Sequence, residues 1–385
     1  MAKDASLLNG PKNHVLLAYI IIATSFFYMM AIYIMKIILP YIAFNIGLSD
    51  VLVSRILYIG FLCFTLTPIA GYITNSLGYR RTIIIASIVE SLCILLFIWA
   101  RSYHSLFTVR FIQAFFGVLL SASFLHLASY YAKRSGAYIG FLRGAQALGM
   151  AFGSLVVIVL CGVPFNYLIM LASIFCLTPI SAILIKDEPP KESFNVRKVR
   201  SSILRRDLLP YYIFALTEIL SVAILFSFFN VFLIEEFALE LRTYAIIMLT
   251  AVSLFAISSV IAGRLVDRHP MTCGVFGACG IAISLSLILI LNGLIELIFA
   301  FLLFEVVSAF AYNPLYIVVS KRVSEDVRGF AINFADFLVN LSFLTLPLIE
   351  ILAKNVNLKF PVVIGLVLAI LSILISVIWI FRGKI

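Results

Sequence analysis

The stretch GYITNSLGYRR, residues 71–81, separates two long apolar runs of the chain. The runs cover residues 48–73 and 82–100, and each is long enough to cross a bilayer as a helix. A link this short between two such runs predicts a tight turn at a membrane face. Its glycines allow a close helix approach and a sharp bend. Its paired arginines mark that face as cytoplasmic, because basic residues accumulate there.

The composition indicates that the bilayer is the solvent for most of the chain. Of the 385 residues, 63% are hydrophobic and 12% charged, and the mean hydropathy is +1.15. A soluble globular protein has far less apolar sequence. The net charge of +10 does not indicate nucleic-acid binding, since the basic residues follow the pattern of membrane topology. The six cysteines lie in or beside apolar runs with no C-x-x-C spacing, so we expect neither a disulfide framework nor a metal site.

Twelve apolar runs of about 20 residues or more predict twelve transmembrane helices. We place them near residues 15–39, 48–73, 80–100, 104–131, 136–161, 164–185, 209–234, 241–263, 271–290, 294–319, 328–353 and 360–381. The chain then consists of an N-terminal six-helix bundle (1–185), a cytoplasmic linker (186–208) and a C-terminal six-helix bundle (209–385). With both termini inside, 20 of the 28 Lys and Arg lie in cytoplasmic segments and four in outer segments. We therefore predict that both termini are cytoplasmic.

The quoted stretch also has a recognisable spacing, G-x-x-x-N-x-x-G-x-R-R. It resembles the loop between helices 2 and 3 of the major facilitator superfamily, which usually reads G-x-x-x-D-R-x-G-x-R-R. Gly71, Gly78, Arg80 and Arg81 match this pattern. Asn75 stands where the family has an acid, so an ionic version of the loop contact is weakened in this half.

The second half of the chain repeats features of the first. Gly263 and Asp267, followed by Arg268, end the eighth run as the quoted loop ends the second. Arg110 in the fourth run aligns with Glu305 in the tenth at an offset of 195. The resemblance implies an all-α fold of two pseudo-symmetric six-helix bundles, related by an axis along the membrane normal. It also implies that both loops take part in gating.

Polar side chains at helical spacing predict a path between the two halves. A charge at membrane depth costs at least ~2.5–3.5 kcal/mol, so we expect each to have a function. Residues that step by three, four or seven positions share one helix face. The candidates for the substrate and proton pathway are Tyr28, Arg110, Gln113, Arg143, Glu218, Glu305, Tyr312, Asp336 and Asn340.

The signs of these charges predict a basic wall in the first half facing an acidic wall in the second. The repeat places Arg110 opposite Glu305, and Arg143 opposite Asp336 at an offset of 193. The alternative is that these charges form static ion pairs that close one side of the path.

Three further charges stand apart from this path. Glu90 lies on a helix that is peripheral in the superfamily, so we expect it to be protonated or paired within its own half. Lys36 and Arg55 lie near the outer ends of their spans, where long basic side chains can snorkel to the surface.

The sequence lacks a nucleotide-binding Gly-rich loop, a metal-ligand cluster and a nucleophile beside a base. We therefore predict no enzymatic activity and no cofactor. The expected function is secondary transport of a small solute by alternating access, coupled to protons, by a monomer in the plasma membrane. Export of amphipathic compounds and transport of a small anionic metabolite both stay open. The alternatives are a transporter-like sensor that binds a ligand without moving it and, less well supported, a membrane-embedded enzyme.

Overall fold

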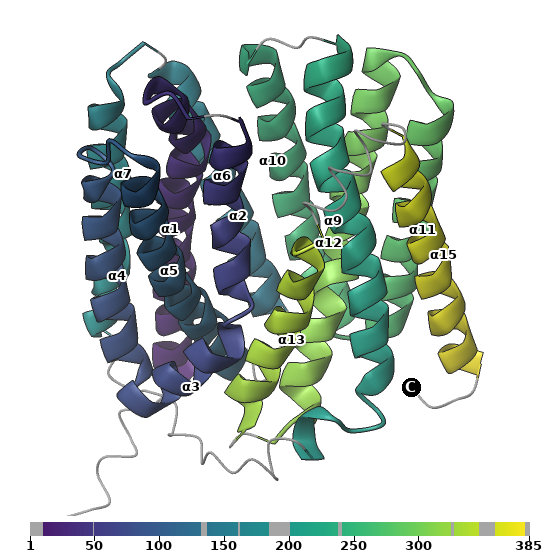
Figure 1. Cartoon of the computed structure of the whole chain (residues 1–385). Helices are drawn as coiled ribbons and strands as arrows, with labels where there is room; N and C mark the ends of the chain where they lie inside the picture. Colours follow the sequence, from purple (N-terminus) through teal and green to yellow (C-terminus); the bar gives the residue numbers. More distant parts are fainter. Residues whose placement is uncertain are drawn as a thin grey trace, which may run out of the picture.

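The helices of the chain form two bundles that stand side by side, one from each half of the sequence (Figure 1). The computed structural model describes residues 11–48, 50–131, 137–160, 162–184, 201–237, 241–324, 327–345 and 359–381. The first bundle contains α1 (Pro11–Asn45), α2 (Asp50–Phe64), α3 (Thr67–Leu77), α4 (Tyr79–Leu96), α5 (Tyr103–Tyr131), α6 (Ala137–Val159), α7 (Phe165–Cys176) and the 3₁₀ helix η2 (Thr178–Leu184). The second contains α9 (Leu209–Phe237), α10 (Leu241–Val266), α11 (Pro270–Ile290), α12 (Leu294–Arg322), α13 (Arg328–Phe343) and α15 (Phe360–Phe381).

Two of the predicted spans are interrupted. The predicted span 48–73 consists of α2 and α3, and Pro68 lies at the start of α3. Proline has no backbone N–H to donate to the preceding turn, so it favours a helix start at this position. The predicted span 164–185 consists of α7 and η2. Within the described residues, seven helices are long and apolar enough to cross a membrane unbroken.

Some of the predicted boundaries cannot be compared with the structure. Residues 185–200, which contain most of the predicted linker, lie outside the described residues, and so does the end of the predicted span 328–353.

Gly71 and Gly78 have the roles that the quoted loop predicts. Gly78 separates α3 from α4 with a φ of +94°, a backbone conformation that residues with a Cβ rarely adopt. Gly71 lies against α13, and a Cβ there would overlap the side-chain amide of Asn333. The bend and the close approach are therefore both present, and the approach joins the two bundles at one end of the molecule (Figure 1).

The most extensive contact between the bundles is that of α6 with α10. Gly140 and Gly144 let the two helices touch, since a Cβ at Gly140 would lie 2.6 Å from a backbone oxygen of α10. Further along α6, Gly149 and Gly153 pack against α1 in the same way, with a Cβ at Gly153 2.7 Å from a backbone oxygen of that helix. Helix α6 therefore makes backbone-to-backbone contacts with both bundles.

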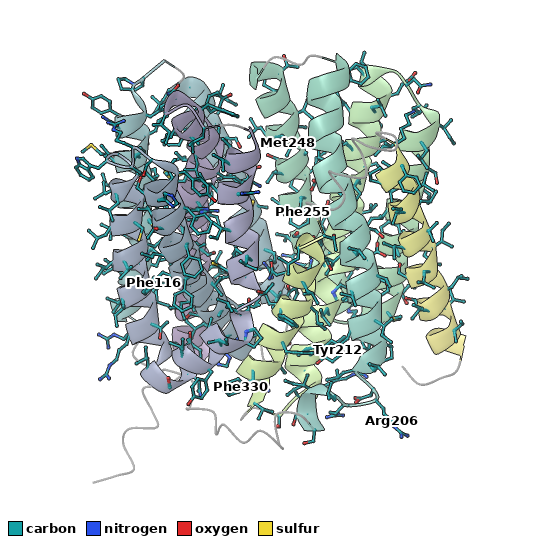
Figure 2. All side chains as sticks on the ribbon, viewed as in Figure 1. Phe116, Arg206, Tyr212, Met248, Phe255 and Phe330 are labelled. Atoms are coloured by element: carbon teal, nitrogen blue, oxygen red, sulfur yellow. The ribbon has the colours of Figure 1, made fainter. Side chains whose placement is uncertain are left out.

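The molecule is apolar both inside and on its outer surface. Ile295 and Phe299 on α12 are 80% and 75% exposed, which suits contact with lipid. Met248 and Phe255 of α10 lie along the middle of the molecule, where the two bundles face each other (Figure 2). Phe255 packs edge-on against Tyr312, with ring centroids 6.3 Å apart. Aromatic side chains therefore line part of the boundary between the bundles.

Candidate functional site

The first group of polar side chains in the interior surrounds Arg110 of α5. The Nη1 atom of Arg110 donates a hydrogen bond to Oε1 of Gln113, one helical turn further on. The amide of Gln113 donates to Oε1 of Glu90 at 3.3 Å. The hydroxyl of Tyr28 on α1 donates to the same Oε1 at 3.3 Å. Three predicted site residues therefore meet, and they meet around an acid that the sequence analysis placed at the periphery.

Two glycines make room for the Arg110 group. A Cβ at Gly117 would lie 3.1 Å from the Tyr28 hydroxyl and 3.2 Å from Oε1 of Glu90. A Cβ at Gly60 on α2 would lie 2.6 Å from Nη2 of Arg110. The backbones of α2 and α5 therefore approach the polar atoms closely. Arg110 and Gly117 lie seven residues apart, so they share one face of α5.

Lys36 of α1 lies next to this group, and this was missed by the sequence analysis. Its Nζ atom stands 5.2 Å from the centre of the Tyr33 ring. It is also within electrostatic range of Arg110. The side chain is exposed. The cationic side chains of Lys36 and Arg110 therefore lie close together on the same side of the first bundle.

Glu305 of α12 approaches the same wall from the second bundle. Its side chain is buried and lies within electrostatic range of Tyr33. Among the described residues, its Oε1 atom has no hydrogen-bond partner. The repeat predicted Arg110 opposite Glu305, but the hydrogen bonds of Arg110 lead to Glu90 in its own bundle instead.

The second group of polar side chains joins the two bundles. The Nη2 atom of Arg143 on α6 lies 3.6 Å from Oδ1 of Asp336 on α13, as the repeat predicted. Tyr316 on α12 donates to Oδ1 of Asp336 at 2.8 Å, and its ring lies 4.8 Å from the Arg143 guanidinium. Asn340 donates to Oδ2 of Asp336 at 3.1 Å, and Arg143 donates to Gln146 at 3.4 Å. Side chains of three helices, α6, α12 and α13, therefore contact the carboxylate of Asp336.

Glu218, also predicted to line the path, lies apart from both groups. It is fully buried in α9 and accepts a hydrogen bond from the hydroxyl of Ser372 on α15. One turn along α9, Ser221 donates to the carbonyl oxygen of Gly365 on α15 at 3.0 Å. In this structure Glu218 joins two helices of the second bundle.

Comparisons with known proteins agree with this architecture. A protein-family model described as the Major Facilitator Superfamily matches residues 21–347, most of the chain. The chain belongs to this superfamily. Among solved structures, the human organic anion transporter MFSD10 (TETRAN) has the same fold, with a TM-score of 0.75. The two share 15% sequence identity, and the match covers 96% of this chain and 100% of that one. A search of curated proteins finds no significant match.

Membership of the Major Facilitator Superfamily confirms the predicted fold of two helical bundles and makes the chain a multi-pass membrane transporter of a small molecule. The loop of the first half, residues 71–81, joins α3 to α4 at one end of the bundle. Asn75 is buried, Arg80 is half-buried and Arg81 is exposed. Position 75 holds no acid, and Gly71 of this loop packs on Asn333 of α13 in the second bundle.

The corresponding loop of the second half does keep its acid in an ion pair. Asp267 accepts a hydrogen bond from Nζ of Lys321 on α12 at 2.6 Å. The neighbouring Arg268 is exposed. Gly263 lies within contact of Gly140 on α6. This superfamily member therefore has a packed loop in one half and an ionic loop in the other.

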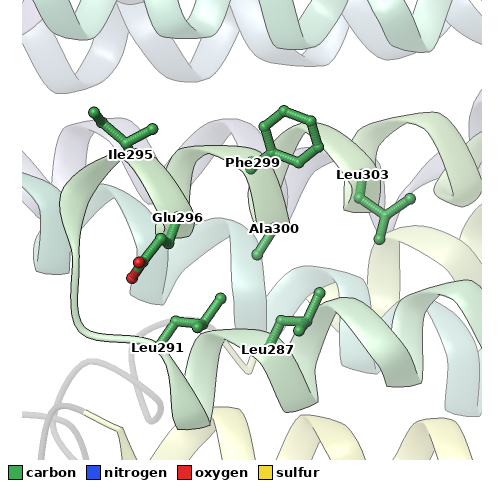
Figure 3. A pocket seen from close by; sticks show the side chains of 7 residues that line it. All are labelled: Leu287, Leu291, Ile295, Glu296, Phe299, Ala300 and Leu303. Carbon is green, nitrogen blue, oxygen red and sulfur yellow. The ribbon is translucent and has the colours of Figure 1, made fainter.

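A separate hollow of about 310 Å³ lies on the outer surface of the second bundle (Figure 3). It lies between α11 and α12, and its lining is apolar apart from Glu296, which accepts a hydrogen bond from the backbone N–H of Gly293. None of the pathway candidates lines it. The two polar groups therefore lie apart from this hollow.

Proposed function

We propose that this protein transports a small organic anion by alternating access, in exchange or together with protons. The observation that carries this proposal is the pair of cations, Lys36 and Arg110, on one interior wall. Among the described residues neither of them has a carboxylate within 4.0 Å. Arg110 is half-buried, and an intramembrane cation without a direct partner is costly, so an anionic substrate would compensate it, while the exposed Lys36 adds positive charge beside it. The structurally similar MFSD10 is described as an organic anion transporter, which is the same chemical class.

The contacts between the bundles support a state that is closed on one side. Gly71 lies six residues before the end of α3, and Arg143 lies six residues after the start of α6. Both helix ends belong to the side that the basic residues assign to the cytoplasm, and both contact α13. We therefore place the anion site above a closed cytoplasmic side, open to the outside.

The remaining features of the proposal rest on the same topology. The bundles comprise residues 1–185 and 209–385, with the linker 186–208 and both termini in the cytoplasm. The protein functions as a monomer in the plasma membrane. Protons are the coupling ion because buried carboxyls lie near the cations, with Glu305 as the acid of the second bundle.

The test is flux in proteoliposomes that contain the purified protein and a pH-sensitive dye. The pools to screen are carboxylates, sulfonates, sugars, amino acids and cationic drugs. We expect flux of a carboxylate or sulfonate with a change in internal pH, and a loss of about tenfold or more in Arg110→Ala and Lys36→Ala. Arg101→Ala, which removes an exposed cation outside the helices, is the matched control.

Three other outcomes would each contradict part of the proposal. Flux of cationic drugs alone would make the protein an exporter of amphipathic compounds. Binding without flux of solute or proton would make it a sensor. A Glu305→Gln variant with unaltered transport and unaltered pH dependence would remove Glu305 from the pathway.

A further inference from the structure

Glu90 reaches from a peripheral helix into the interior of the first bundle. Its side chain is 1% exposed. Its Oε1 atom accepts hydrogen bonds from Tyr28 and Gln113, and Oε2 has no hydrogen-bond partner among the described residues. A buried carboxylate with one unsatisfied oxygen is costly unless a nearby charge balances it.

Arg110 is the charge that balances Glu90. The other titratable groups that face Glu90 are Tyr28 from α1, Cys176 from α7 and Cys93 on α4 itself. A tyrosine and two thiols in an apolar interior are uncharged, so among the described residues Arg110 is the one cation that faces this carboxyl. Because Gln113 stands between them, the two charges interact without forming a direct ion pair.

We propose that Glu90 is the group that takes up a proton when the anion binds at Arg110. This inference rests on the proposed function, since it needs an anion at the Lys36 and Arg110 wall. The positive charge of Arg110 stabilises a bound anion, and it also stabilises the ionised form of Glu90. The side chain of Lys36 is exposed, so solvent screens its charge. Lys36 therefore stabilises the negative charge of Glu90 only weakly.

The chemistry is a simple protonation that accompanies binding. The anion binds to Arg110. The Glu90 carboxylate then forms an O–H bond with a proton that comes from the water in contact with the exposed Lys36. One negative charge and one proton enter together, so the charge of the loaded site equals that of the empty site. When the anion leaves on the other side, Glu90 returns its proton to the water there.

The first test is the pH dependence of anion binding to the purified full-length protein, with naphthalene-1-sulfonate, sulfate and benzoate as probes. The sulfonate stays ionised throughout, so any pH dependence of its affinity belongs to the protein. We expect its affinity to fall by up to about tenfold per pH unit between about pH 5 and pH 8 in the wild type. In Glu90→Gln, which keeps the size and the hydrogen-bonding oxygen, the affinity should be independent of pH.

Glu218→Gln is the matched control for Glu90→Gln. It removes a carboxyl that is equally buried but accepts a hydrogen bond from Ser372 on α15, within the second bundle. We expect this variant to keep the pH dependence of the wild type. Anion binding with the same pH dependence in Glu90→Gln as in the wild type would overturn the inference and leave the proposed function standing.

The second test detects the proton directly by infrared difference spectroscopy at neutral pH. Addition of the sulfonate should bring up the carbonyl band of a protonated carboxyl in the wild type and in Glu218→Gln, but not in Glu90→Gln. Binding without this band overturns the inference. Failure of the wild type to bind any of the three probes instead contradicts the proposed function, so the two failures can be told apart.

Discussion

The two polar groups of this transporter use the same four kinds of residue in different places. Each has an arginine that donates to a glutamine one turn further on, together with a tyrosine that donates to a carboxylate. The group of Arg110 lies within the first bundle, on α1, α4 and α5. The group of Arg143 spans both bundles, on α6, α12 and α13. The first can move as a unit with its bundle, whereas the second must break when the bundles separate.

This difference assigns different tasks to similar chemistry. A charged group that keeps its neighbours through the whole cycle can carry a substrate. A charged group whose partners lie on the other bundle can hold one state and be released in the next. Four predictions test the distinction, from the largest expected effect to the smallest.

Substitution of Arg110 should have the largest effect. Arg110→Ala removes a charged hydrogen-bond donor from the anion site, which corresponds to about ten- to a hundredfold in affinity. The initial rate of anion uptake into proteoliposomes should fall accordingly, while the distance between the cytoplasmic ends of the bundles stays the same. If this distance changed as much as it does in Asp336→Asn, the assignment of separate tasks would be wrong.

Asp336→Asn should release the cytoplasmic contact. It leaves Arg143 without its anionic partner across the boundary, at a cost of about 2 kcal/mol, or roughly a 30-fold shift toward separated cytoplasmic ends. Spin labels at the exposed Leu77 and Ser324 report this as a longer distance. Asp267→Asn is the control, because Lys321 lies in the same bundle as Asp267. An equal shift in the control would contradict the assignment.

Gly71→Ala should have a smaller effect on the same distance. The new Cβ would overlap the amide of Asn333, and overpacking of this kind costs about 1–2 kcal/mol when a side chain can partly yield. The double variant Gly71→Ala with Asn333→Ala removes the obstacle and should restore the short distance. Failure of the second substitution to compensate would show that the close approach of α3 and α13 does not hold this side closed.

Asp207 should show the smallest effect, and it depends on pH. Partial burial works against its ionisation, but the hydrogen bonds and charge of Arg205 and the charge of Arg322 hold the pKa of Asp207 below its usual range. Its ionised form therefore stabilises the fold above the ordinary Asp pKa of about 3.9, and this contribution is lost as the pH falls through the lowered value.

The measurement is thermal unfolding in detergent of the wild type and Asp207→Asn. We expect the wild type to be more stable by less than about 1 kcal/mol near neutral pH, because the pair is largely exposed. The difference should shrink as the pH falls below about 5 and disappear once the pH is below the lowered pKa of Asp207. A difference that grew with acidity would mean that the carboxyl is stabilised in its protonated form.

The sequence predicted the fold well because membrane helices follow from local composition. Runs of apolar residues, the bend at Gly78 and the close approach at Gly71 each follow from a few neighbouring residues. The pair Arg143 and Asp336 was predictable because the internal repeat maps one half onto the other. These inferences needed no knowledge of side-chain direction.

The partners of Arg110 were not predictable in the same way. Glu90 lies on a helix that the superfamily places at the periphery, and only the rotation of α4 about its own axis turns the carboxyl inward. Lys36 was expected near the surface because its position along α1 is near the outer end, but its direction places it by Arg110. Depth along a helix can be read from a sequence more easily than rotation about the helix axis.

The glycines of α6 have a mechanical consequence. Gly140 and Gly144 leave the surface toward α10 without protruding side chains, so the two backbones touch along a smooth strip. Only the side chain of Val260 is among the nearest atoms to these two glycines, so a shift of one helix along the other would displace few side chains at this point. Gly149 and Gly153 hold the same helix equally close to α1, so we expect α6 to move with the first bundle when the two bundles change their relative position.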